Sequence, residues 1–317
     1  VGPSLNLVEQ FETVDGQVRP LKTVAGETEP EPTDPIEELK STDRYVVYDS
    51  PSDLFADRDP RLEGTILVPG SSFRNQELQL WAGLAIKHSE TSWEFKHIAE
   101  MEDLTSADES KYLYDGRQIT GADGPHISFR SPNPEQVTGT GFLLRKYVDS
   151  KAGSEMMGQS DLAFCRFRYA EVLLNAAEAA WELGEKAKAA DYLNEVRRRA
   201  GIREIEPDEI TGYETFLRER TAEFAFEGLR FYDLKRFRIA DKLFDGQADT
   251  ETALIYGLWP YKVYAPGDPD DGKWIFRRIH NTKRKFPLWF QTKNYYASID
   301  QSVLNNNPLL VKNPYQE

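Results

Sequence analysis

Aromatic rings and planar polar groups stand close together at two places in this sequence, and that mixture suits the binding of a sugar. The two places are residues 73–81 and residues 93–97. A sugar offers an apolar C–H face that packs on an aromatic ring, and hydroxyl groups that hydrogen-bond to amide, carboxylate or guanidinium groups. The same tryptophans could instead fill small cores beneath loops. The predicted ligand-binding residues are Phe73, Arg74, Asn75, Gln79, Trp81 and Trp93.

Residues that could carry out catalysis show no diagnostic spacing. Glycoside hydrolysis needs two carboxyl groups about 5–10 Å apart, and no motif marks such a pair among the many acidic residues. The four histidines lack metal-ligand spacing, and the single cysteine, Cys165, has no histidine near it in the sequence. We therefore predict that the protein is not an enzyme and uses no cofactor and no metal ion. We expect Cys165 in the core.

Charge and composition narrow the range of partners. The formal net charge of −14 over 317 residues would repel nucleic acid and anionic lipid, so neither is an expected direct partner. Aromatic residues make up 12% of the chain, which is enough both for a core and for exposed stacking rings. The basic stretch Lys273–Lys293 is expected to be a solvated face. No stretch of the sequence reaches the length of apolar residues that a membrane-spanning helix needs.

Apolar residues recur at helical spacing only in the middle of the chain. The spacing predicts a helix over Arg166–Leu183 and a second helix that ends at Gly201. Together they form an antiparallel hairpin of the tetratricopeptide kind. Thr211 and Glu214 predict a capping box at the start of a third helix, and a fourth is expected over residues 230–244.

The segments around these helices have little periodicity. Tyr45–Tyr48 and Gly64–Val68 predict short strands. Residues 1–40, with acidic and proline-rich runs such as Gly26–Pro35, predict a long surface loop that forms no packed core. We therefore divide the chain into three regions. They are a loop-rich ligand-binding lobe with short strands at 1–160, a helical region at 161–245 and an irregular segment packed on the same unit at 246–317.

Four segments form a recognisable set in this order along the chain. Arg58-Asp59-Pro60-Arg61 comes first, and its arginines are expected to satisfy backbone carbonyls. Residues 168–201, residues 218–236 and Lys312-Asn313-Pro314-Tyr315 follow. Together they resemble the C-terminal part of the SusD/RagB family, whose members carry helical repeats and an acylated N-terminal cysteine before this part. Phe286–Phe290 departs from the Pro-Ile-Pro of the family.

The resemblance implies a mainly α, SusD-like fold, in which tetratricopeptide-type helical hairpins pack against an irregular loop-rich lobe with few short strands. It implies a lipoprotein of the bacterial outer membrane, at the cell surface, that binds an oligosaccharide and delivers it to a SusC-like TonB-dependent transporter. The membrane would be contacted only through a lipid anchor, expected in residues that precede Val1. The alternatives are a RagB-like component that captures peptides, a glycoside hydrolase, and a cytoplasmic peptide-binding repeat adaptor.

The charged residues of these motifs are expected to stabilise the fold rather than to touch a ligand. Side chains three residues apart lie on the same face of a helix, so opposite charges at that spacing can pair. The expected ion pairs are Arg220–Glu223, Glu227–Arg230 and Asp233–Arg236.

Overall fold

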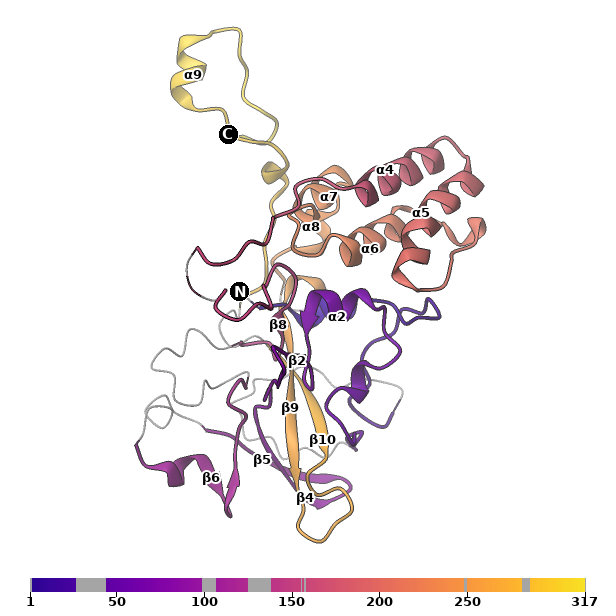
Figure 1. Cartoon of the computed structure of the whole chain (residues 1–317). Helices are drawn as coiled ribbons and strands as arrows, with labels where there is room; N and C mark the ends of the chain where they lie inside the picture. The colour runs from indigo at the N-terminus through magenta and orange to yellow at the C-terminus, as the bar shows by residue number, and fades with distance from the viewer. Residues whose placement is uncertain are drawn as a thin grey trace.

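A computed structural model of the chain places a group of helices and a β-sheet at opposite ends of the molecule (Figure 1). It describes residues 2–26, 44–98, 107–124, 138–154, 156, 158–247, 250–280 and 286–316. Residues 27–40 of the predicted loop, and part of the basic stretch Lys273–Lys293, lie outside these residues. The loop prediction is wrong for the part that precedes residue 27, because Leu5, Phe11 and Leu21 are buried in the core. The predicted solvated face is wrong for Arg277 and Arg278, whose side chains are buried. The described part of the chain contains no helix that is both long and apolar enough to cross a membrane.

The predicted helical hairpin is confirmed. It consists of α4 (Tyr169–Glu182) and α5 (Lys186–Ala200), whose facing stripes of leucine, alanine and valine form one buried cluster. Gly201 ends α5 in the left-handed conformation, with φ of 79°, which glycine adopts without a steric penalty. Its assignment as a tetratricopeptide repeat stays a prediction.

The next two helices form where they were expected, but with different ends. The helix α6 (Tyr213–Glu223) has Gly212 as its N-cap and makes no side-chain cap, so the predicted capping box at Thr211 is wrong. The fourth predicted helix is two helices, α7 (Arg230–Arg236) and α8 (Ala240–Leu243). Arg238, with φ of 58°, breaks the helical path between them.

Residues 246–317, expected to be irregular, contain two strands of a four-stranded sheet, an edge strand and the inner strand beside it. The strands β9 (Tyr256–Tyr264) and β10 (Trp274–His280) pair with each other in antiparallel fashion. The sheet order is β10-β9-β4-β5, with β4 (Gly83–Ser89) parallel to β9 and antiparallel to β5 (Ser92–Lys96). The expectation of a mainly α fold with few short strands is therefore corrected to a mixed architecture. A strand buried on both faces lacks the alternation of apolar and polar residues that identifies a half-exposed strand.

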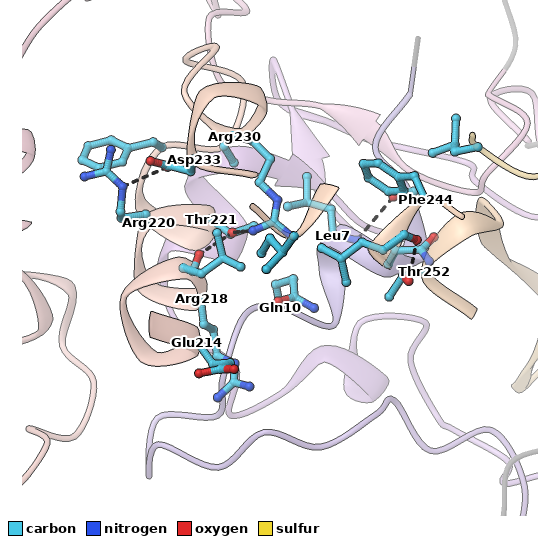
Figure 2. A pocket seen from close by; sticks show the side chains of 18 of the residues that line it. Leu7, Gln10, Glu214, Arg218, Arg220, Thr221, Arg230, Asp233, Phe244 and Thr252 are labelled. Carbon is cyan, nitrogen blue, oxygen red and sulfur yellow. Dashed lines mark hydrogen bonds and ion pairs between the residues drawn. The ribbon is translucent and has the colours of Figure 1, made fainter. Parts of the chain in front are cut away.

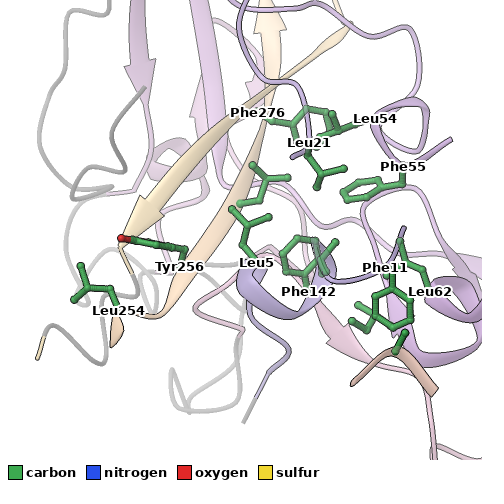
Figure 3. Packing of buried hydrophobic residues seen from close by; sticks show 14 residues of the cluster. Leu5, Phe11, Leu21, Leu54, Phe55, Leu62, Phe142, Leu254, Tyr256 and Phe276 are labelled. Atoms are coloured by element: carbon green, nitrogen blue, oxygen red, sulfur yellow. The ribbon is translucent and has the colours of Figure 1, made fainter. Parts of the chain in front are cut away.

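Each face of this sheet carries its own core. Leu258 and Phe276 lie on one face and belong to a cluster that includes Leu5, Phe11 and Phe142 (Figure 3). The other face carries a second cluster around the neighbouring residues of β9 and β10. Its members include Ala85, Trp93, Phe95, Trp259, Tyr261, Val263, Ile275 and Ile279.

Short elements complete the fold. The predicted strand at Gly64–Val68 is reduced to β1 (Ile66–Leu67), and the Tyr45–Tyr48 segment makes only isolated bridges, at Tyr45 and Tyr48. Cys165 is half-buried rather than in the core. The remaining α-helices and strands of the described residues are α1 (Leu5–Val8), α2 (Arg61–Thr65), β2 (Ser72–Phe73), β3 (Gln76–Glu77), β6 (Leu113–Tyr114), β7 (Arg117–Gln118), β8 (Leu143–Leu144) and α9 (Gln301–Asn306). The helix α9 projects away from the other helices (Figure 1).

A buried ion-pair network joins α2 to α6. Arg61 contacts Asp59 at 2.6 Å, Glu219 at 2.6 Å and Glu223 at 2.9 Å. Arg58, the first arginine of the same motif, donates to the carbonyl of Phe11 at 3.1 Å, as expected. The prediction of carbonyl partners is wrong for Arg61, because its guanidinium meets three carboxylates that the fold brings to it.

Two of the three expected ion pairs are replaced by contacts over longer sequence distances. Arg220 pairs with Asp233 at 2.9 Å instead of Glu223. Glu227 pairs with Lys146 at 2.5 Å instead of Arg230. The expected Asp233–Arg236 pair is confirmed at 3.1 Å. Residues three apart can pair on a helix, but these carboxylates point toward other segments that pack against it.

Candidate functional site

A tight hairpin presents the first group of predicted ligand-binding residues. The strands β2 and β3 are joined by Arg74 and Asn75 alone, with φ of 53° and 61°, which is the pattern of a type I′ turn. The Asn75 side chain is exposed at the tip. Arg74 instead folds back onto the protein and donates to the carbonyl of Asp149 at 2.8 Å and to the hydroxyl of Ser154 at 2.7 Å.

The Phe73 side chain packs within this hairpin instead of standing free on the surface. Its ring is half-buried, and the guanidinium carbons of Arg74 and Arg145 lie 5.4 Å and 5.2 Å from the ring centroid. Cation–π contacts of this kind hold the ring in place. Phe73 and Arg74 therefore position the hairpin, while Asn75 is the member of the group that is open to a ligand.

Trp81 is the centre of an aromatic cluster on the sheet. Its half-buried ring packs edge to face against Trp274, with 5.6 Å between the ring centroids. The ammonium group of Lys262 lies 5.5 Å from each of these two rings. Gln79, two residues before Trp81, has an exposed side chain, and its backbone N–H donates to the carboxylate of Asp123 at 3.1 Å.

Close packing fixes the backbone on which Trp81 sits. The Gly121 amide donates to the Trp81 carbonyl at 3.1 Å. A Cβ atom on Gly121 would lie 1.9 Å from the carbonyl oxygen of Gln79 and 2.7 Å from Cε3 of Trp81. Only glycine fits at that position, because real Cβ atoms do not approach other heavy atoms so closely.

Tyrosine and arginine extend this cluster along β9. Lys262 and Tyr264 lie two residues apart on one strand and so point to the same face of the sheet. The Tyr264 ring packs against Tyr114 with 5.2 Å between centroids, and the Arg117 guanidinium carbon lies 4.8 Å from its centroid. We call this surface the aromatic strip. Its members are Trp81, Tyr114, Arg117, Lys262, Tyr264 and Trp274.

Charged partners hold the polar end of the strip in one arrangement. Arg117 makes two hydrogen bonds to the Asp271 carboxylate, both of 2.7 Å. These bonds raise the pKa of Arg117 and lower that of Asp271. The Tyr264 hydroxyl donates to Asp115, which raises the pKa of Tyr264. The strip thus offers rings with fixed guanidinium and carboxylate groups beside them, which is the combination that a sugar needs.

The prediction for Trp93 is wrong. Burial alternates along β5, and Trp93 is 2% exposed on its inner side. Its ring packs against Tyr45 at a centroid distance of 5.8 Å and belongs to the second sheet cluster. A ring in this position fills the core and cannot stack on a ligand.

Sequence reasoning missed most of the strip because β9 and β10 were assigned to loops. Of the predicted residues, the structure places Trp81 in the strip and leaves Asn75 and Gln79 exposed on the same length of chain. The signal that could have found Trp274 and Tyr264 is the pair of aromatic runs at 256–264 and 274–280, separated by a turn rich in Gly, Pro and Asp. Among the described residues, no group of three or more His, Cys, Asp or Glu side chains could hold a metal ion.

Comparison with known proteins relates the whole chain to one family. The model of the SusD family matches residues 1–315. A curated relative, SusD-like protein P2 of Formosa agariphila, is 36% identical over an alignment of 98 residues that covers 27% of this chain and 19% of that protein.

Solved structures have the same fold. A SusD-like protein from Bacteroides fragilis superposes with a TM-score of 0.57 and 20% identity over 99% of this chain. A SusD-like carbohydrate binding protein from the same species superposes with a TM-score of 0.51 and 24% identity over 96% of this chain. The chain spans about half of each of these two proteins, 47% in both cases.

Proposed function

Because the chain belongs to the SusD family, we propose that it binds an oligosaccharide at the outer-membrane surface and passes it to a SusC-like TonB-dependent transporter. The observation that carries the binding proposal is the aromatic strip. Trp81, Trp274 and Tyr264 are partly exposed rings, and Lys262 and Arg117 lie beside them as hydrogen-bond donors. The similar structure from Bacteroides fragilis that is described as carbohydrate binding agrees with this proposal.

The proposed role is binding without chemistry. A general acid in glycoside hydrolysis must hold a proton that it can donate. The buried carboxylates Asp59, Glu219 and Glu223 are all ion-paired with arginine, so we assign them a role in the fold. For Glu223, the hydrogen bond from Arg168 and the charges of Arg61 and Arg168 outweigh burial and lower the pKa, which does not suit a general acid.

Delivery to a transporter requires only modest affinity. When the binding protein is held on the transporter, a ligand that it releases is at a high effective concentration for the transporter. Tight binding therefore adds little to uptake. The lipid anchor and the transporter partner are part of the proposal and follow from the family. Capture of a peptide is the alternative outcome, and the experiment below includes it.

The test is isothermal calorimetry with panels of plant, host and microbial oligosaccharides and of short peptides. Trp81→Ala and Trp274→Ala should each weaken glycan binding about tenfold or more, because a well-packed ring at a binding surface contributes a large share of the affinity. Trp289→Ala is the control, since its ring is 68% exposed but does not belong to the strip. Folded strip variants that bind the same glycan as tightly as the wild type would contradict the site. Binding of peptides alone would replace glycan by peptide as the ligand.

A further inference from the structure

A cavity lies among the helices, and no residue of the aromatic strip lines it. The cavity has a volume of about 710 Å³ and is formed by the N-terminal segment, α6, α7 and residues 239–255 (Figure 2). This volume is within the range of small-molecule sites. The apolar part of its wall includes Leu217, Phe224, Ile239, Leu243, Phe244 and Leu254.

Arg230 is the first sign that this cavity takes an anion. Figure 2 shows its side chain extending into the space between Thr221 and Leu7. Its guanidinium donates to the Thr221 hydroxyl at 2.7 Å, and no carboxylate of the described residues lies within ion-pair distance of it. Burial lowers the pKa of Arg230, since desolvation disfavours the charged form. The charge of Asp233 acts on Arg230 from beyond ion-pair distance and does not offset this burial. A half-buried guanidinium without a direct ion-pair partner is unusual, because a desolvated charge is costly unless it is paired.

Three more cations line the same cavity, and two of them, Arg218 and Lys242, have no close carboxylate among the described residues. Nε of Arg218 is buried and has no hydrogen-bond partner among the described residues. In the described part of the chain, the carboxylate closest to Arg218 is that of Glu12, at 3.9 Å. Lys242 is exposed at the cavity and makes no ion pair within the described part of the chain.

The acidic residues of the wall do not balance these charges. Asp233 is already paired with Arg220 at 2.9 Å and with Arg236 at 3.1 Å, which leaves Glu214 as the other carboxylate on the wall. The cavity is therefore a local excess of positive charge in a chain of net charge −14. An anionic group bound there would supply the missing hydrogen-bond acceptors as well as the missing charge.

We propose that this cavity binds an amphipathic carboxylate, with the carboxylate on Arg230 and the hydrocarbon part against the apolar wall. A planar guanidinium and a carboxylate form paired hydrogen bonds, which matches the free donors of Arg230. Leucine, isoleucine and phenylalanine side chains on the wall offer no hydrogen bonds, so they suit a hydrocarbon chain better than a sugar ring. The site is separate from the one proposed for the oligosaccharide.

The probe is decanoate, titrated into the chain by calorimetry, with decanol as the uncharged analogue. Decanoate should bind. The affinity for decanol should be lower by a factor of about ten or more, because decanol lacks the charge-assisted hydrogen bonds. Arg230→Met should reduce decanoate affinity by a similar factor and leave decanol binding unchanged. Arg166→Met is the matched control, since Arg166 is exposed and does not line the cavity.

Folding of the variants is followed separately by thermal unfolding. Without ligand, Arg230→Met should melt at the same temperature as the wild type or higher, because it removes a desolvated charge that has no direct ion pair with the described residues. Lys242→Met serves as a second variant, since Lys242 is exposed and its replacement should leave the fold intact. It should lower the affinity for decanoate several-fold. The proposal is overturned if decanoate does not bind, if decanol binds equally well, or if folded Arg230→Met binds decanoate as the wild type does.

Discussion

Glu223→Gln should destabilise the chain strongly, although the side chain keeps its size. The Glu223 side chain is 1% exposed and ion-paired with three arginines. Arg61 contacts it at 2.9 Å and Arg199 at 2.7 Å, and Arg168 is hydrogen-bonded to the same carboxylate. These arginines come from α2, from α5 and from the residue before α4, so one carboxylate holds three segments on α6.

The expected loss is about 3 kcal/mol of unfolding free energy. Removing one partner of a buried ion pair costs about 3–5 kcal/mol, because the remaining charge loses its compensation. The lower value applies because a glutamine can still accept hydrogen bonds, and because Arg61 keeps Asp59 and Glu219 as partners. Urea titration followed by circular dichroism measures the change.

The control and the pH dependence make this prediction specific. Glu195→Gln removes an exposed carboxylate of α5 and should change the unfolding free energy by less than about 0.5 kcal/mol. Burial alone would raise the pKa of Glu223, but the hydrogen bond from Arg168 and the charges of Arg61 and Arg168 outweigh it and lower that pKa. The carboxylate therefore stabilises the fold above the unfolded-state pKa of about 4.3, and its contribution is lost as pH falls through the lower folded-state value. The difference between wild type and Glu223→Gln should shrink over that acidic range. Equal effects of the two substitutions at neutral pH would refute the account of the network.

Three further substitutions test the packing around the proposed site and the network. Gly121→Ala should displace the Trp81 segment and destabilise the chain by about 1–3 kcal/mol, whereas Gly64→Ala, where an added Cβ meets no atom within 4 Å, should be neutral or stabilising in the same titration. Trp93→Ala should lower the unfolding free energy by about 3–5 kcal/mol because it leaves a large cavity in the core, and a loss below 1 kcal/mol would contradict the buried position. Arg61→Lys should lower it by about 2 kcal/mol, since an ammonium group cannot repeat the guanidinium hydrogen bonds to three carboxylates, and a wild-type urea midpoint would argue against that role.

Sequence reasoning succeeded where structure depends on near neighbours in the chain. The stripes that predict α4 and α5, and the glycine that ends α5, are local features because each helical hydrogen bond spans four residues. The pair Asp233–Arg236 was predictable for the same reason. The prediction of a capping box at Thr211 was wrong because α6 begins one residue later than expected. Its N-cap is Gly212, which has no side chain to cap the helix.

The candidate site was predicted only in part. Trp81 was identified from its polar neighbours, but the same argument selected Trp93, and composition cannot tell which face of a strand is covered. The structure separates them, because Trp93 faces the core on β5 while Trp81 lies just before β4 against Trp274. The partners Lys262 and Trp274 lie more than a hundred residues away in sequence and reach Trp81 through the pairing of β4 with β9 and of β9 with β10.

The helical hairpin, the order of the four motifs and, through them, the family of the chain follow from the amino-acid sequence. The sheet order, the exposure of each tryptophan and the carboxylates that each arginine meets depend on how distant segments pack. The physical reason is the range of the interactions. Helix periodicity and turns depend on residues a few positions apart, whereas strand pairing and buried ion pairs depend on which distant segments pack together.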